Sequence, residues 1–145
     1  MAFSYTDTLT IDYTQVDSDL TNFPTLVSLS GTWLKTIALG GHIGNSNGYD
    51  IQFFSDSGLT TKLNWEVEFY DNVNGILVAW VQIPTVSSST NTVFYIGYGD
   101  ATVITFQGNV AGTWDSNYLG VWHLGNGTSC RRQRLPGICA DKDGR

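Results

Sequence analysis

Apolar and polar residues alternate along several short stretches of this chain, and this period of two constrains the fold more than any other feature. In LNWEVEFY (63–70), Trp65 and Phe69 fall on a predicted apolar face, whereas Glu68 and Tyr70 fall on a polar one. Successive side chains of a β-strand point to opposite faces of a sheet, so every second residue lies on the same face. The pattern therefore predicts a strand with one face toward a core and one toward solvent.

Six or more strand-length segments follow one another at roughly ten-residue spacing, separated by Gly, Asn, Asp and Ser. The nearly continuous apolar run GILVAWVQIP (75–84) predicts a central strand buried on both faces, entered by a hairpin turn at 71–75. A single helical turn is expected only in SGTWLKTIALGG (30–41). The sequence predicts an all-β fold, an antiparallel β-sandwich of jelly-roll-like architecture over residues 1–100.

Beyond the predicted sandwich, residues 101–112 are expected to form a connector. TWDSNYLGVWHL (113–124) then has the composition of a strand, within a segment 113–129 that has no predicted partner in the chain. A strand with large apolar side chains is stabilised when it adds to a sheet edge. The residues predicted to mediate such assembly are Trp114, Tyr118, Val121, Trp122 and Leu124.

Charged residues make up 14% of the chain, well below the ~25% usual in soluble domains. Thr, Ser, Asn and Gly replace them, which is typical of secreted and surface-displayed β-proteins. Residues 1–129 carry a net charge of −9, which disfavours binding to nucleic acid or anionic membranes. No apolar run approaches the ~18 residues of a membrane span, so membrane insertion is not expected. We expect an extracellular, cell-surface or virion location, reached through a leader removed earlier or by another export route.

The last sixteen residues, 130–145, differ from the rest in carrying a net charge of +3 and both cysteines. Cys130 and Cys139 could close a small disulfide loop in an oxidising compartment. Asn126 begins an N-x-T sequon, which matters only in a glycosylating compartment.

Two short motifs suggest chemistry, and each has a simpler explanation. GNSNG (44–48) matches the G-x-S-x-G pattern around Ser46, but a nucleophile elbow requires a strand before it and a helix after it. A turn is the favoured interpretation. Asn45, Asn47 and Asp50 offer oxygen ligands for calcium, as do Asp17 and Asp19, but the spacing of an EF-hand is absent. Ordinary Asx-turns are favoured there. We therefore predict no catalytic residue, no metal site and no cofactor.

Two further groups of side chains allow a binding or catalytic role. Glu66 and Glu68 lie two residues apart on one strand, with about 6.5–7 Å between their Cα atoms. This spacing is compatible with the two carboxylates of a glycosidase. Outward-facing, solvated carboxylates are favoured instead. A sugar-stacking platform could include some of Trp33, Tyr49, Tyr70, Trp80, Tyr98, Trp114 and Tyr118. Trp65 and Trp80 are expected in the core.

Five motifs follow one another along the chain: TLTIDYTQVDSDLTNFPTLVSLS, LKTIALGGHIGNSNGYDIQFFSDSG, TTKLNWEVEFYD, LVAWVQIPTVSSSTNTVFYIGYGD and TWDSNYLGVWHLGNGT. In this order they resemble the bacterial, archaeal and phage domain of unknown function 2341, over about residues 3–128. The resemblance implies a module of large surface or fibre proteins that commonly precedes a concanavalin-A-like lectin domain. It brings no catalytic residue with it. The tail SCRRQRLPGICADKDGR resembles nothing in that family, so it is either a frameshifted or truncated end or the tail of a short standalone protein.

These observations favour a non-catalytic extracellular structural module. We expect it to form a homo-oligomer or homopolymer, a filament built by adding the strand at 113–124 to a neighbouring copy. The alternative is a carbohydrate-binding module of a cell-surface or phage fibre protein.

Overall fold

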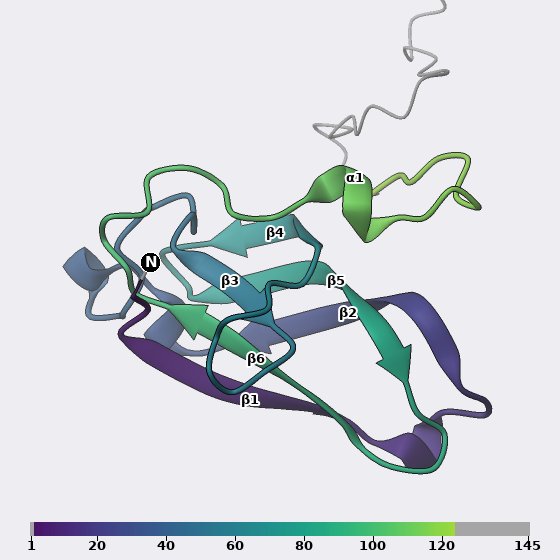
Figure 1. Cartoon of the computed structure of the whole chain (residues 1–145). Coiled ribbons are helices and arrows are strands. Elements are labelled where there is room, and N and C mark those ends of the chain that lie inside the picture. The colour runs from purple at the N-terminus through teal and green to yellow at the C-terminus, as the bar shows by residue number, and fades with distance from the viewer. Residues whose placement is uncertain (1, 124–145) are drawn as a thin grey trace, which may run out of the picture.

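Two three-stranded antiparallel sheets pack face to face in the computed structural model, which describes residues 2–123 (Figure 1). One sheet has the order β1-β6-β3 and the second has the order β2-β5-β4. This arrangement confirms the predicted all-β sandwich. The strands are β1 (Tyr5–Ile11), β2 (Leu20–Ser30), β3 (Ile51–Phe54), β4 (Trp65–Asp71), β5 (Ile76–Val86) and β6 (Thr92–Tyr98).

The core lies between the sheets and takes its side chains from the inner faces of both. Phe53 on β3 and Ile96 on β6 are fully buried, as are Leu77 and Val81 on β5. The Trp65 ring packs edge-on against Phe53, with 5.1 Å between ring centroids. Full burial of side chains of this size stabilises a fold by about 1.5–3 kcal/mol each. These contacts join the two sheets into one sandwich.

The first and last strands of the sandwich are direct neighbours. Tyr5 at the beginning of β1 lies opposite Tyr98 at the end of β6, and Ile11 lies opposite Thr92. The main-chain nitrogen of Ala2 donates to the Asp100 carboxylate at 2.8 Å. The chain therefore enters and leaves the sandwich at the same end of the β1–β6 strand pair.

Strand β5 is central in the second sheet, as predicted, but its two faces are not equally buried. Leu77, Ala79 and Val81 face the core and are fully buried. Val78 and Trp80 lie on the outer face and are only half-buried, so the expectation of a core position for Trp80 is wrong. The sequence of β5 is apolar on both faces, but other residues cover its outer face only in part.

A β-bulge in β4 changes the predicted alternation. Val67 lies opposite Ala79 and Phe69 lies opposite Val78, so Glu68 is an extra residue in the strand. Beyond the bulge the faces exchange. Phe69 points outward with half of its surface exposed, and the Tyr70 hydroxyl donates to the main-chain oxygen of Leu34 at 2.7 Å. The predicted faces of these two residues are therefore wrong, because strict alternation cannot include an extra residue.

The connection between β4 and β5 is a short, strongly constrained turn. Gly75 there has φ +72°, and a Cβ at this position would lie 2.2 Å from the main-chain oxygen of Gly31, so only glycine fits. The segment 30–41 holds two 3₁₀ turns, η2 (Thr32–Leu34) and η3 (Ile37–Leu39), where one helical turn was expected. A third, η1 (Tyr13–Gln15), follows β1.

After β6 the chain crosses the end of the sandwich and reaches the outer face of the second sheet (Figure 1). Val103 is buried, and Phe106 packs against Trp65 with 4.9 Å between ring centroids. The one-turn helix α1 (Val110–Thr113) follows. The strand predicted at 113–124 is wrong for the described residues, because none of residues 114–123 is in a strand.

An Asx-turn explains why this segment bends. The Asp115 carboxylate accepts from the main-chain nitrogen of Asn117 at 2.8 Å, and the main-chain nitrogen of Tyr118 donates back to Asp115. This local hydrogen bonding competes with an extended conformation. The apolar residues after it are therefore presented by a loop.

Candidate interaction site

The outer face of the second sheet holds two carboxylates beside an indole ring. Cross-strand pairing places Glu66 opposite Trp80, and the bulge places Glu68 near the same ring. The Trp80 Nε1–H donates to Glu68 Oε2 at 2.7 Å. In the sequence, this site is marked only by two acidic residues two positions apart on β4. The tryptophan beside them comes from the neighbouring strand β5, so the local pattern does not include it.

Residues 109–123, which we call the covering segment, lie across this part of the sheet. Asn109 caps α1, since its side-chain oxygen accepts from the main-chain nitrogen of Gly112 at 3.1 Å. Asn64, just before β4, accepts from the Asn109 amide at 3.0 Å and donates to the Gly112 oxygen at 3.2 Å. These bonds fix the start of the covering segment to the edge of the sheet.

Aromatic rings continue the attachment. Trp114 packs against Trp80, with 5.3 Å between centroids and an interplanar angle of 52°. The Tyr118 ring meets Trp114 edge-on at 5.0 Å. Offset and edge-on pairs of this kind contribute about 0.5–1.5 kcal/mol beyond their buried area. The covering segment is thus held to the sheet by side chains.

His123 makes the last described contact of the covering segment. Its Nε2 is in hydrogen-bonding contact with Glu66 Oε1, and its Nδ1 lies 3.3 Å from Glu68 Oε2. Glu66 is fully buried as a result, although it was expected to face solvent. That expectation is wrong because the residue that covers Glu66 lies 57 positions away in the sequence.

Two polar atoms beneath the covering segment have no hydrogen-bond partner among the described residues. They are Glu66 Oε2 and Trp114 Nε1. A buried carboxylate oxygen without a hydrogen-bond partner costs free energy.

Between its two attachments the covering segment presents apolar side chains to solvent. Leu119 is 91% exposed, Trp122 is 59% exposed and Tyr118 is 37% exposed. We call residues 118–122 the apolar loop. Figure 1 shows that the chain after α1 projects beyond the sheet and then returns toward α1. Val121 is half-buried within this loop.

Four of the residues singled out from the sequence for assembly or modification, Leu124, Asn126, Cys130 and Cys139, lie outside the described residues. Trp114 and Tyr118 are brought together with Trp80, and Trp122 lies in the exposed part of the loop.

The turn before β3 has the hydrogen bonding expected of Asx-turns. Asp50 is fully buried, and its carboxylate accepts from the main-chain nitrogens of Gly44 at 2.6 Å and Asn45 at 3.0 Å. The Asn45 side chain accepts from the nitrogen of Asn47 at 2.8 Å. Ser46 lies in this turn and is followed by strand β3, which is not the setting of a nucleophile elbow.

Other aromatic candidates lie apart from the covering segment. Tyr5 stacks on His42 with 4.0 Å between centroids, and Trp33 packs against Tyr98 at 4.7 Å. Burial raises the pKa of Tyr98, and the hydrogen bond that its hydroxyl donates to Asp7 adds to this effect. Tyr98 is almost fully buried, so it offers no open ring face to a sugar.

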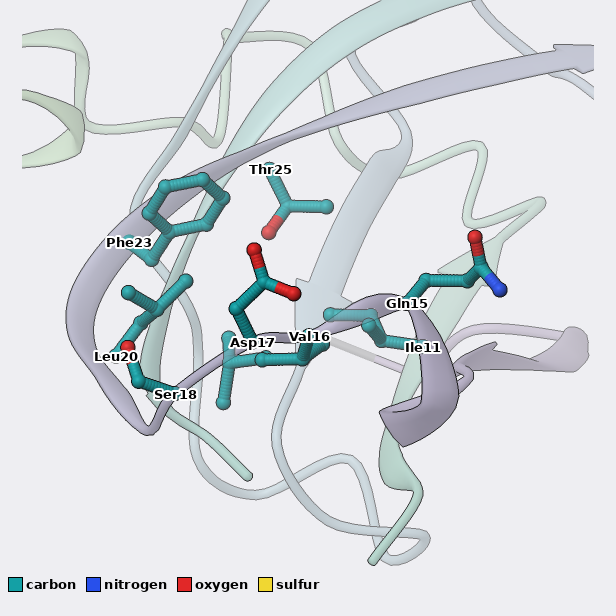
Figure 2. Close-up of a pocket in the computed structure, with 9 residues that line it drawn as sticks. Ile11, Gln15, Val16, Asp17, Ser18, Leu20, Phe23 and Thr25 are labelled. Atoms are coloured by element: carbon teal, nitrogen blue, oxygen red, sulfur yellow. The ribbon is translucent and has the colours of Figure 1, made fainter. Parts of the chain in front are cut away.

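A groove of about 410 Å³ lies at the end of the sandwich near η1 (Figure 2). The Asp17 carboxylate points into it between Phe23 and Thr25. Thr25 Oγ1 is buried without a hydrogen-bond partner among the described residues. The groove is lined by Ile11, Gln15, Val16, Asp17, Ser18, Leu20, Phe23, Thr25 and Val86.

Among residues 2–123, the helices are all too short or too polar to span a bilayer. In that same range, no group of three or more His, Cys, Asp and Glu side chains is placed to hold a metal ion.

The fold and the aromatic–acidic site thus define a small β-sandwich module with a covered outer face. Residues 47–118 match the model of a family described as a domain of unknown function, DUF2341. The chain therefore carries a domain of this family, as the resemblance indicated. The match begins in the turn before β3 and includes β3 to β6, α1 and the start of the apolar loop. No curated protein and no solved structure matches the chain.

Proposed function

We propose that this protein is a non-catalytic, extracellular structural module that self-associates through its apolar loop. The observation that carries the proposal is the exposure of Leu119 and Trp122 in a loop whose two ends are attached to its own sheet. Large apolar side chains held outward in this way favour contact with another protein surface. The low content of charged residues supports a location on a cell surface or virion.

The second surface of the proposed contact is the uncovered part of the outer sheet face. Leu26 lies opposite Trp80 in the strand pairing and is 50% exposed, and Phe69 is equally exposed on β4. The apolar loop of one copy packs on these residues of the next copy. Two different surfaces meet in this contact, so it does not form a closed dimer. Repeating the contact from copy to copy extends a filament. Side-chain docking replaces strand addition here, because residues 114–123 form no strand.

Light scattering and electron microscopy of the full chain test the proposal, with reducing agent present because Cys130 and Cys139 could crosslink copies. We expect polymers. The loop variant Leu119→Ser/Trp122→Ser and the face variant Leu26→Ser/Phe69→Ser each remain monomeric with a native circular dichroism spectrum. The control Ile37→Ser removes another exposed aliphatic side chain, outside both surfaces, and still polymerises.

Mixing the two variants sharpens the test. Each variant retains one functional surface, so an equimolar mixture forms dimers of the two variants but no larger assemblies. A monomeric wild-type chain, or a loop variant that polymerises as the wild type does, shows the proposal to be wrong.

The groove of Figure 2 favours carbohydrate binding as a second candidate function. Its exposed Phe23 ring offers an apolar face, and the Asp17 carboxylate beside it can accept hydrogen bonds from sugar hydroxyls. Glycan-array binding that is lost in Phe23→Ser and Asp17→Asn, but retained in the loop variant, supports this function. Absence of binding to any glycan counts against it.

A further inference from the structure

We infer that the groove near η1 binds a cationic amino sugar, a pyranose that carries an ammonium group beside its hydroxyls. The inference rests on the second candidate function, carbohydrate binding, and assigns the chemical class of its ligand. Its basis is a carboxylate and a hydroxyl in the groove that both lack a hydrogen-bond partner among residues 2–123. An exposed aromatic ring lies beside them.

The groove lies between the two sheets, where the sandwich opens at one end. Ile11 ends β1 in one sheet, and Val86 ends β5 in the other. Phe23 and Thr25 lie on the same face of β2 as Val27, which is buried in the core. The groove is therefore an open end of the core with largely apolar walls. Its volume of about 410 Å³ falls in the range of roughly 300–1,000 Å³ that is usual for small-ligand sites.

The Asp17 carboxylate supplies an unpaired charge to this groove. In Figure 2 it points into the space between Phe23 and Thr25. Within the described part of the chain, every other aspartate and glutamate has a hydrogen-bond or ion-pair contact. Asp19, two positions further on, accepts from Ser88 at 2.8 Å. The fold described here gives Asp17 no such structural role, so its carboxylate remains available to a ligand.

The charge around the groove favours a cation over a neutral or acidic ligand. Residues 5–30, which include β1, η1 and β2, contain four aspartates and no lysine, arginine or histidine. Of the two lysines in the described range, Lys62 donates to Gln107 and Lys35 lies beside the β4–β5 turn. The negative surroundings raise the local concentration of cations. An ammonium group at Asp17 would form charge-assisted hydrogen bonds with it.

The Thr25 hydroxyl distinguishes an amino sugar from a basic side chain. Its oxygen is buried and has no hydrogen-bond partner among the described residues. A hydroxyl can both donate and accept, whereas the end groups of lysine and arginine only donate. A sugar hydroxyl can accept from Thr25 while the ammonium group donates to Asp17. The exposed ring of Phe23 offers an apolar surface to the C–H face of the pyranose.

Isothermal titration calorimetry of the full-length chain tests the inference with a glucosamine tetrasaccharide and its fully N-acetylated counterpart. The two sugars share one backbone and differ in charge, because acetylation converts each amine to a neutral amide. We expect the chain to bind the glucosamine oligomer about fivefold more tightly, the upper value for a solvent-accessible ion pair. Added salt should reduce this difference. A lysine tetrapeptide should bind more weakly than the glucosamine oligomer, since it brings no sugar hydroxyl to Thr25.

Three variants assign the effect to the groove. Asp17→Asn should remove the preference for the glucosamine oligomer. The matched control Asp19→Asn removes the same charge outside the groove and should keep the preference. Thr25→Val should weaken binding of the glucosamine oligomer by about two- to tenfold. It should leave resistance to urea unchanged or increased, because the buried hydroxyl makes no hydrogen bond within the described fold.

Equal affinity for the two sugars overturns the inference and leaves carbohydrate binding itself intact. A preference that survives Asp17→Asn also overturns it, as does a lysine peptide that binds as tightly as the glucosamine oligomer. If neither sugar binds, the inference is wrong, and the glycan array shows separately whether carbohydrate binding fails as well.

Discussion

At the scale of single residues, aspartates hold the turns of this sandwich. Asp56 accepts from the main-chain nitrogens of Thr61 at 2.6 Å and Thr60 at 3.1 Å. Hydrogen bonds to the ionised carboxylate favour its charged form and lower the pKa of Asp56 to about 2. Hydrogen bonds from the Thr14 hydroxyl and main-chain N–H lower the pKa of Asp12. Hydrogen bonds from the main-chain and side-chain nitrogens of Asn74 lower the pKa of Asp71.

The depressed pKa of Asp56 predicts an acid-dependent contribution to stability. A carboxyl with a lower pKa in the folded state stabilises the fold above its ordinary pKa of 3.8, and this contribution is lost as the pH falls through about 2. In urea unfolding, Asp56→Asn is expected to be less stable than the wild type near neutral pH. The two converge as the pH approaches 2. The control Asp17→Asn changes a carboxylate that accepts no hydrogen bond from the described residues, and should be as stable as the wild type near neutral pH. A constant difference between Asp56→Asn and the wild type would contradict the prediction.

At the scale of elements, the β4 bulge decides which aromatic side chain supports the fold. Tyr70→Phe removes the hydroxyl that donates to Leu34 and leaves that main-chain oxygen without its donor. We expect a loss of about 1–2 kcal/mol in the free energy of unfolding. Phe69→Ser, at the half-exposed neighbour, should cost less. Uninterrupted alternation would give the opposite order, so urea denaturation of the two variants distinguishes the two registers.

The sequence predicts the elements better than it predicts their exceptions. Alternation and turn residues place strands near 63–70, 75–84 and 93–99, because burial on one face imposes a period of two. The bulge escapes such reasoning, since nothing in WEVEFY marks Glu68 as the extra residue. The strand expected at 113–124 fails because a local Asx-turn outweighs apolar composition.

The candidate site could be predicted only in part. Trp114 and Tyr118 were identified because large aromatic residues beyond a complete sandwich require a partner. The role of His123 could not be predicted, because its contacts depend on how the chain folds back over the second sheet. No local pattern encodes a contact between residues 57 positions apart.

At the scale of the whole molecule, the sandwich core does not depend on the covering segment. The core cluster is formed by residues up to Phe106, and none of its members lies in residues 109–123. A chain that ends at residue 108 should keep a β-rich circular dichroism spectrum and cooperative urea unfolding. It should not polymerise. A truncated chain without a cooperative transition would show that the segment is required for folding.

The pairing of β1 with β6 sets how the module responds to mechanical force. Tension between the N-terminus and the chain after β6 acts at one end of this antiparallel pair, where Tyr5 lies opposite Tyr98. The hydrogen bonds between the strands then break one after another, as in peeling, and do not resist together, as they do in shear. The sandwich should therefore open at low force. A module pulled between these two points would lengthen by unzipping, and its extensibility would come from the register of two strands.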